Sequence, residues 1–343
     1  MSNTSKIVLI TGATAGIGRM TALHLAKRGH HVIATGRKPA ELQKLALEAN
    51  QELAALGAKA LATGRNGRKA VTGKLDTLLL DVTSLASITA AAESVDKLTG
   101  GRGIDVLVNN AGFGALGPTS EITDAEMRRN YETNVFGLMN VTRAFLTGMM
   151  QRRSGRIVNV SSVGGRITLP FFGVYNSTKY AVESLSDALR WELRPFGIDV
   201  SLIEPGVIRT NFEATAVANL DVFASTPYAK AVAKYEKMSK TADRFASEPI
   251  VIAKAIARAV EARRPSARYV APFTTNFAIL FARILPQGMW DWAMRQVAFL
   301  NKKTLGLDGT AATAKPATTP SADHVSVASR SSKPAVDARL AAN

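Results

Sequence analysis

The segment YNSTK at residues 175–179 places a tyrosine and a lysine four residues apart. On a helix, side chains with this spacing share one face about 6 Å apart. A tyrosine with its ordinary pKa of about 10 is a poor proton donor at neutral pH. An ammonium ~5 Å from a phenolate stabilises it by roughly 3 kcal/mol at an effective dielectric of about 20. We therefore predict that Lys179 lowers the pKa of Tyr175 toward neutrality, so that Tyr175 can protonate a carbonyl oxygen.

A glycine-rich turn, TGATAGIG at residues 11–18, follows the apolar run KIVLI and precedes a helical pattern. Glycines here let the backbone approach a pyrophosphate closely, and the following helix directs unpaired N–H groups toward it. Glycine is also common in ordinary loops, but its position between strand and helix favours a dinucleotide site. The predicted cofactor-binding residues of this turn are Gly12, Thr14, Gly16, Ile17 and Gly18.

The second apolar run ends HVIATGRKP, where a dinucleotide's adenosine ribose would lie. An NAD site usually has a carboxylate at this place, but here Gly36 is followed by Arg37. A guanidinium can bind a 2′-phosphate through two hydrogen bonds. The sequence therefore favours NADP(H), with NAD(H) as the second choice. The alternative is that Arg37 is merely a solvated residue at a loop tip.

Two further strand ends supply candidate cofactor contacts. Asp81 and Val82 end the run LLLDV, where Asp81 could accept a hydrogen bond from adenine or simply begin the next helix. In VLVNNAG, Asn109 and Asn110 could bond the backbone of neighbouring strands where the strand order reverses. The predicted cofactor contacts of this segment are Asn110, Ala111 and Gly112.

Short β-rich runs alternate with helical patterns up to about residue 206. Strands apolar enough to be covered on both faces, in regular βαβα alternation, predict an α/β fold with a Rossmann-type doubly wound parallel sheet. We expect one catalytic domain over 1–272, with a basic surface insertion at 57–75 and a substrate loop at 207–245. An apolar helical segment follows at 273–301, including an amphipathic helix near 277–297. The Ala, Thr, Ser and Pro composition of 302–343 predicts a disordered tail.

Composition excludes several kinds of site. The 343 residues contain no cysteine, and the four histidines have no metal-ligand spacing, so we predict no metal. The charge-free apolar run 269–282 is 14 residues long, too short to span a membrane. The N-terminus has no signal-peptide pattern, which favours the cytoplasm. Much of the net charge of +16 lies at 58–74 and 302–343, where no aromatic residue could stack on bases, so we expect no nucleic-acid partner.

Six motifs occur in a fixed order: TGATAGIG, NNAG, ETNVFG, NVSSVGG, YNSTK and EPGVIRT. Together they resemble the short-chain dehydrogenase/reductase family over roughly residues 5–270. EPGVIRT with a C-terminal helical extension is similar to the branch that contains 17β-hydroxysteroid and retinol dehydrogenases. The resemblance implies an enzyme that interconverts CH–OH and C=O groups with NAD(P), and a homodimer or homotetramer.

The resemblance also implies roles for single residues. Tyr175 matches the catalytic acid/base, Lys179 its partner, and Asn134 a proton-relay residue that locally breaks or widens its helix. Ser162 matches the carbonyl-binding serine, because it precedes Tyr175 by 13 residues, whereas Ser161 does not. The segment that holds the nicotinamide carboxamide corresponds to Pro205, Gly206, Val207 and Thr210.

Apolar residues surround these positions and predict a hydrophobic ketone, aldehyde or alcohol as substrate. Phe171 and Phe172 are the predicted substrate contacts beside Ser162 and Tyr175, and Phe212 and Phe223 extend the wall. A steroid, retinoid or fatty carbonyl would suit it. The alternative function is a redox-sensing protein that binds NADP(H) without turnover. Residues 273–300 could pack within the protein or make peripheral contact with a membrane.

Overall fold

The computed structural model describes residues 5–62, 73–210, 220–242 and 246–308. The chain divides into two units, Met1–Gly306 and Leu307–Asn343, and all helices and strands below belong to the first. The domain boundary expected at residue 272 therefore falls inside this unit. Most of the basic stretch at 57–75 and of the predicted tail lies outside the described residues.

The described residues form a sheet with strand order β3-β2-β1-β4-β5-β6-β7, in which all pairs are parallel. The order reverses between β1 and β4, where Leu9 pairs with Leu107. The strands are β1 (Ile7–Ile10), β2 (His31–Gly36), β3 (Lys74–Leu79), β4 (Val106–Asn109), β5 (Gly155–Val160), β6 (Ile198–Pro205) and β7 (Arg268–Ala271). The predicted doubly wound sheet is confirmed.

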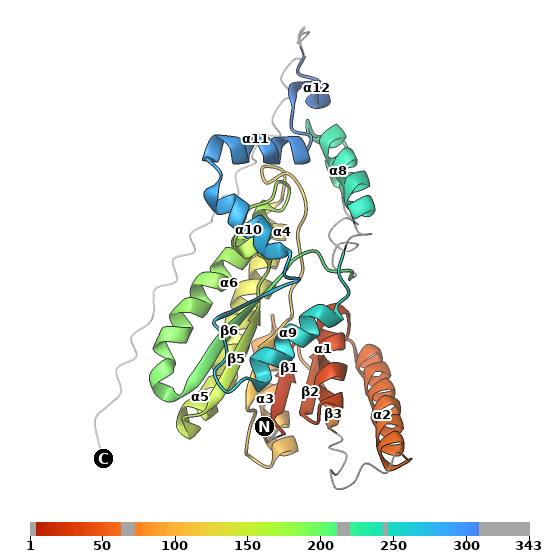
Figure 1. Cartoon of the computed structure of the whole chain (residues 1–343), viewed down its shortest axis with the longest axis vertical. Helices are drawn as coiled ribbons and strands as arrows, with labels where there is room; N and C mark the ends of the chain where they lie inside the picture. The colour runs from red at the N-terminus through yellow and green to blue at the C-terminus, as the bar shows by residue number, and fades with distance from the viewer. Residues whose placement is uncertain (1–4, 63–72, 211–219, 243–245, 309–343) are drawn as a thin grey trace, which may run out of the picture. The chain divides into compact units, whose positions relative to one another are not determined.

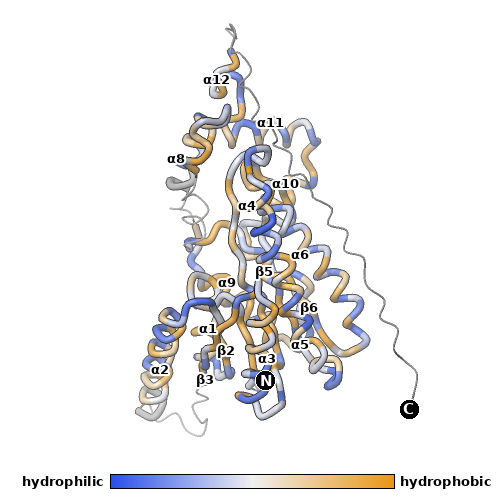
Figure 2. The backbone as a smooth tube through the Cα atoms, turned by 180° about the vertical axis from the view of Figure 1, so that it is seen from behind, coloured by the Kyte–Doolittle hydropathy of each residue, from blue (hydrophilic) through white to orange (hydrophobic). Residues whose placement is uncertain are grey.

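Helices cover both faces of the sheet, because the central strands are apolar on both sides (Figures 1 and 2). One core joins the sheet to α1 (Gly16–Lys27), α2 (Pro39–Ala62) and α9 (Ile250–Glu261). The opposite core joins it to α3 (Leu85–Thr99), α5 (Leu138–Arg152) and α6 (Gly173–Glu192). This arrangement aligns the carboxyl ends of all strands along one edge, where ligands bind in such folds.

A third apolar cluster forms a cap that includes the segment before α6. Its buried members are Leu116, Phe171, Leu220, Phe223, Ala231, Val232 and Ala298. The helices beyond the sheet are α8 (Ala229–Ala242), α10 (Thr275–Ile284), α11 (Gln287–Val297) and α12 (Lys302–Leu305), and α4 (Asp124–Tyr131) precedes α5. The cap therefore gathers residues that are far apart in sequence. It lies above the edge formed by the carboxyl ends of the strands, which we call the cofactor edge.

Three expectations about the chain's periphery are corrected. The basic stretch is not a separate insertion throughout, because 57–62 continue α2 and β3 begins at Lys74. The helix expected near 277–297 is two helices, because Pro286 separates α10 from α11. The predicted tail starts too early, since 302–305 form α12, whose Thr304 hydroxyl accepts a 3.2 Å hydrogen bond from Lys234 of α8. The long loop with short helices that was expected at 207–245 includes α8.

Candidate active site

The glycine-rich turn lies at the carboxyl end of β1 and leads into α1. Gly12 has φ +64°, and a Cβ there would lie 2.9 Å from Ala111 Cα. A Cβ on Gly18 would lie 2.3 Å from the Gly12 carbonyl oxygen. No larger residue fits at either place without moving backbone. Thr14 lies against Gly36 at the end of β2, so the turn spans the ends of two strands.

Asn110 holds this turn in place across the point where the strand order reverses. Its Nδ2 donates hydrogen bonds to the carbonyl oxygens of Thr11 at 2.9 Å and of Gly12 at 3.0 Å. The amide of Ala111 donates to the Thr11 hydroxyl. Asn109 differs from the expectation, because its Nδ2 bonds the side chains of Thr142 and Asn159 rather than backbone. Asn110 thus supports the turn by fixing its carbonyl groups.

Arg37 is exposed directly after β2, and its charge acts on Asp81 beside it. Burial alone would raise the pKa of Asp81, but hydrogen bonds from Thr83 and the charge of Arg37 bring it below its ordinary value. Asp81 Oδ1 accepts from the Thr83 amide at 3.0 Å and from the Thr83 hydroxyl at 2.8 Å. Asp81 therefore shapes the start of α3, and its predicted bond to adenine stays a prediction. Val82 is buried beside it.

The structure brings Tyr175, Ser162 and Lys179 together. Tyr175 is buried on the first turn of α6, and its side chain is hydrogen-bonded to that of Ser162. The Ser162 oxygen accepts a 3.0 Å hydrogen bond from the Gly164 amide, so its hydroxyl proton is available to donate. The neighbouring Ser161 is buried and interacts with Glu183 instead. Of the two serines, Ser162 is therefore the one beside the phenol.

Lys179 lies one turn after Tyr175, with its Nζ 5.7 Å from the centre of the Tyr175 ring. This agrees with the separation that the sequence spacing predicts. The ammonium donates a 2.9 Å hydrogen bond to the Val160 carbonyl at the end of β5. Burial lowers the pKa of Lys179 to about 8, although the charge of Glu183 partly opposes this. Lys179 is therefore a cation at neutral pH that lies close to losing its charge.

The prediction for the pKa of Tyr175 is wrong for this structure. Burial raises the pKa of Tyr175 to about 12, although the hydrogen bond to Ser162 acts in the opposite direction. The sequence argument included the attraction of Lys179 but omitted the cost of placing a phenolate in a buried site. Lys179 also directs its Nζ at a carbonyl oxygen rather than at the phenol. Tyr175 is consequently a protonated phenol at neutral pH.

Asn134 lies in a π-helical segment, Glu132–Gly137, between α4 and α5. This confirms that the helix is widened locally, a feature common at functional sites. Asn134 Nδ2 donates to the Phe113 carbonyl at 2.9 Å and to the Thr178 hydroxyl at 3.0 Å, and its Oδ1 accepts from the Phe113 amide. A Cβ on Gly112 would lie 3.0 Å from this Oδ1 and 3.6 Å from Lys179 Nζ. Asn134 therefore joins the Gly112 segment to α6 beside Lys179.

The segment after β6 closes the other side of the site. Pro205 ends the strand, and the Gly206 amide donates to the Ala271 carbonyl at 2.9 Å. Val207 is exposed. The Thr210 methyl lies close to Gly16, because a Cβ added to that glycine would stand 3.3 Å from it. Thr210 thus reaches the glycine-rich turn, and its contact with the nicotinamide carboxamide stays a prediction.

The two predicted substrate phenylalanines have different surroundings. The Phe172 ring lies edge-on to Tyr175 with ring centres 6.3 Å apart. Phe171 is buried in the cap against Tyr235, with ring centres 5.4 Å apart and a left-handed φ of 66°. Phe172 thus lies beside the phenol, where its contact with a substrate stays a prediction, and Phe171 packs in the cap. Phe223 is also a cap residue, and Phe212 lies outside the described residues.

A partly buried ionic network behind Lys179 was missed by the sequence argument. Arg268 of β7 lies 3.1 Å from Glu183, 2.7 Å from Asp187 and 3.0 Å from Glu204. Arg166 also pairs with Glu204 at 2.7 Å. The sequence held one signal that could have revealed this network, namely the spacing of Glu183. Glu183 follows Lys179 by four residues, the same spacing by which Lys179 follows Tyr175. The network links the catalytic helix to the last two strands.

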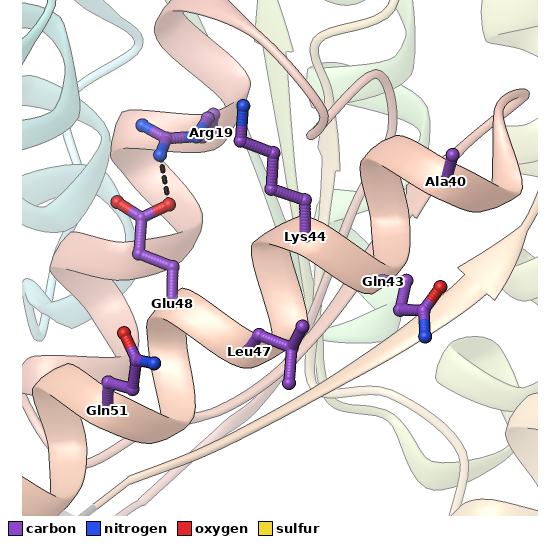
Figure 3. Close-up of a pocket in the computed structure, with 7 residues that line it drawn as sticks. All are labelled: Arg19, Ala40, Gln43, Lys44, Leu47, Glu48 and Gln51. Carbon is purple, nitrogen blue, oxygen red and sulfur yellow. Dashed lines mark hydrogen bonds and ion pairs between the residues drawn. The ribbon is translucent and has the colours of Figure 1, made fainter.

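A surface groove lies between α1 and α2, away from this cluster (Figure 3). It is lined by Arg19, Ala40, Gln43, Lys44, Leu47, Glu48 and Gln51, and Arg19 forms an ion pair with Glu48. None of the predicted site residues lines it. Within the described residues no cluster of His, Asp or Glu could hold a metal ion, and no helix is long and apolar enough to cross a membrane.

The comparison with known proteins identifies the family. The family model described as short chain dehydrogenase matches residues 6–221, which include Asn134, Ser162, Tyr175 and Lys179. The chain is a short-chain dehydrogenase. The family that the sequence motifs resembled is therefore confirmed, and this short-chain dehydrogenase is an oxidoreductase that acts on CH–OH and C=O groups with a nicotinamide cofactor.

Several relatives match most of this short-chain dehydrogenase over nearly their own full length. A 3-ketodihydrosphingosine reductase of Bacteroides thetaiotaomicron is 33% identical over 84% of this chain and 97% of the relative. An NADPH-dependent 3-dehydrocapnine reductase of Ornithobacterium rhinotracheale is 29% identical over 77% of this chain and 87% of the relative. A solved variant of the actinorhodin polyketide ketoreductase with NADPH has a TM-score of 0.62, with 26% identity over 79% of this chain and 97% of that one.

Proposed function

We propose that this short-chain dehydrogenase is an NADP(H)-dependent carbonyl reductase for a hydrophobic ketone or aldehyde, with Tyr175 as the proton donor. The observation that carries the proposal is the buried cluster in which Ser162 bonds Tyr175 and Lys179 lies one turn away. Such a cluster is unnecessary in a protein that only senses NADP(H). The two ketoreductase relatives support the same reaction class.

The proton chemistry favours reduction. When bound, NADPH supplies the hydride that reduces the carbonyl carbon. The Ser162 hydroxyl donates a hydrogen bond to the carbonyl oxygen, keeping its own proton, and stabilises the developing negative charge. Tyr175, protonated because burial holds its pKa at about 12, transfers its proton to that oxygen. The Lys179 ammonium then stabilises the phenolate until a proton from solvent restores the phenol. Oxidation of an alcohol would require Tyr175 to begin as a phenolate.

The residues present fit a dinucleotide cofactor. The turn at Gly12 and Gly18 leaves no room for side chains, so its backbone can approach a pyrophosphate directly. The exposed Arg37 follows the buried Gly36 at the end of β2, where a carboxylate would otherwise repel a 2′-phosphate. These features support NADP(H) as the preferred cofactor. Lys179 and Thr210 complete the site at the nicotinamide end.

The substrate class is proposed from the cap and the relatives. Phe172 beside Tyr175, and the apolar cap behind it, offer little to bond a polar substrate. A long-chain ketone fits such a site, and the relative in Bacteroides thetaiotaomicron is named for a ketone of this kind. A steroid or retinoid carbonyl remains the second class to test.

The test is NADPH oxidation, followed by absorbance, against long-chain keto lipids, steroid and retinoid carbonyls and small aromatic ketones. We expect turnover with long-chain ketones, slower turnover with NADH, and loss of activity in Tyr175→Phe. Tyr180→Phe is the matched control, because Tyr180 is on the same helix but 42% exposed. Tight NADPH binding without turnover of any carbonyl would instead favour the redox-sensing alternative.

We also propose that the protein forms a homodimer or homotetramer through the helices that carry Asn134 and Tyr175. Large apolar side chains are exposed on these helices: Phe136 at 53%, Tyr180 at 42% and Trp191 at 66%. A helix pair across a two-fold axis would bury them. Light scattering on protein eluting from a size-exclusion column should give the mass of a dimer or a larger oligomer. Trp191→Glu should shift this mass toward that of the monomer.

A further inference from the structure

The α10–α11 face is an exposed apolar surface made by two consecutive short helices. It consists of Phe273, Phe277, Leu280, Phe281, Ile284, Met289, Trp292 and Val297. On α10, residues 277, 280, 281 and 284 follow the spacing of one helix face, the pattern that normally faces a protein core. Here all four side chains are between 51% and 63% exposed. Exposure of this kind marks an interaction surface.

The other side of α10 is already occupied. Thr275 and Ile279 are buried, and the Thr275 hydroxyl lies only 2.2 Å from where a Cβ on Gly206 would stand. The first turn of α10 is thus fixed against the Pro205–Gly206 turn at the cofactor edge. At the other end, Ala298 after α11 is buried in the cap. The exposed stripe therefore belongs to a helix that is anchored to the enzyme, and it is free to contact a partner.

The charge of this region selects the kind of partner. Residues 273–303 contain Arg283, Arg295, Lys302 and Lys303, which are all exposed, and a single acid, Asp291. Asp291 accepts a 2.7 Å hydrogen bond from Gln287 on the same helix. Basic residues bordering aromatic and aliphatic side chains match an anionic lipid surface. A second copy of this face would instead bring like charges together.

We propose that α10 and α11 dock this protein on an anionic membrane surface. The helices, of 10 and 11 residues, are too short to span a bilayer, so they would lie in its plane with the apolar stripe inserted. Pro286 between them permits two helices with separate axes to lie on one surface. Docking depends on this face alone and does not require the proposed reaction.

Docking in this way would orient the enzyme. α10 continues from β7, whose carboxyl end lies at the cofactor edge, and α11 leads into the cap that borders Phe172 (Figure 1). The lipid surface would therefore face the side of the molecule where the carboxyl ends of the strands, the start of α6 with Tyr175, and the cap lie. A lipophilic substrate could pass from the bilayer to the site without crossing bulk water.

The test uses the full chain and sedimentation with vesicles of phosphatidylcholine, with and without phosphatidylglycerol. We expect binding only with the anionic lipid and weakening by added salt. Phe277→Glu with Phe281→Glu should lower the partition coefficient about tenfold or more. The control, Leu56→Glu with Leu85→Glu, changes two exposed leucines on α2 and α3 and should bind as the unmodified protein does.

Two results would overturn the proposal: no vesicle binding by the unmodified protein, or equal loss of binding in both double variants. If vesicles bind neither protein and light scattering shows the phenylalanine variant dissociating an oligomer, the face is a subunit contact instead. Circular dichroism checks that the variants fold. If the phenylalanine variant does not fold, Arg283→Gln with Arg295→Gln gives an independent test. That variant should lose binding to anionic vesicles, and unchanged binding would contradict docking.

Discussion

The charge of Glu183 should control the pH at which the enzyme loses activity. Lys179 is buried with its pKa lowered to about 8, and the negative charge of Glu183 raises that pKa relative to burial alone. Replacing Glu183 by Gln removes the charge but keeps a side chain that can accept from Arg268, which lies 3.1 Å from the carboxylate. The ammonium of Lys179 should then lose its proton at lower pH.

The size of the shift follows from the helix geometry. Residues four apart on a helix are about 6 Å from each other, and unit charges at that distance interact by roughly 3 kcal/mol at an effective dielectric of about 20, equivalent to about two pH units. Arg268 is 28% exposed, so water reaches this network and weakens the interaction. We therefore expect the alkaline limb of the kcat profile to move down by about one pH unit in Glu183→Gln.

The direction in which activity changes with pH follows from the protonation state of Lys179 that the reaction uses. The ammonium stabilises the Tyr175 phenolate, and this contribution is present below the pKa of Lys179 and lost as the pH rises through it. Asp187→Asn is the control, because Asp187 also pairs with Arg268, at 2.7 Å, but lies two turns from Lys179. An alkaline limb that stays in place in Glu183→Gln, or that moves equally in both variants, would refute the reasoning.

Three further changes test the cofactor site. Arg37→Ser should raise the KM for NADPH about tenfold, because one charge-assisted contact to the 2′-phosphate is lost, and leave the KM for NADH nearly unchanged; equal changes would contradict it. Gly18→Ala should abolish NADPH binding measured by fluorescence, since its Cβ would lie 2.3 Å from the Gly12 oxygen. Asn110→Ala should destabilise the protein by about 1–3 kcal/mol in urea unfolding, because two carbonyl contacts are lost.

The fold and the glycine-rich turn were predictable because their signals are local. Short continuous apolar runs define the buried strands and period-three-to-four apolar patterns define the helices. A glycine required by a left-handed φ, as at Gly12, also leaves a direct mark in the sequence. The Tyr175–Lys179 separation was predictable for the same reason, since helix geometry alone sets it. The π-helical segment at Asn134 came only from the family resemblance, because its residues have no distinctive pattern.

The periphery was less predictable because composition does not show which face a helix buries. The division of 277–297 into α10 and α11 is an exception, because Pro286 marks it in the sequence. Phe171 was expected to meet a substrate, but its side chain is buried in the cap, where residues from 220–235 and 298–305 converge on it. Such contacts between distant segments leave no local periodicity, so only the structure reveals them.

The acidity of Tyr175 could not have been derived from spacing, because two opposing effects decide it and only one is local. The approach of Lys179 is fixed by the helix, but the cost of ionising the phenol depends on how completely other segments cover it. Phe172, the Ser162 loop and the Asn134 segment, all distant in sequence or on other elements, enclose the first turns of α6 and exclude water. The same enclosure lowers the pKa of Lys179. Burial therefore moves the two pKa values in opposite directions: it raises that of Tyr175, which keeps the phenol protonated, and lowers that of Lys179 to about 8, which still leaves most of the ammonium charged at neutral pH. In this state the pair can deliver a proton to a reduced carbonyl.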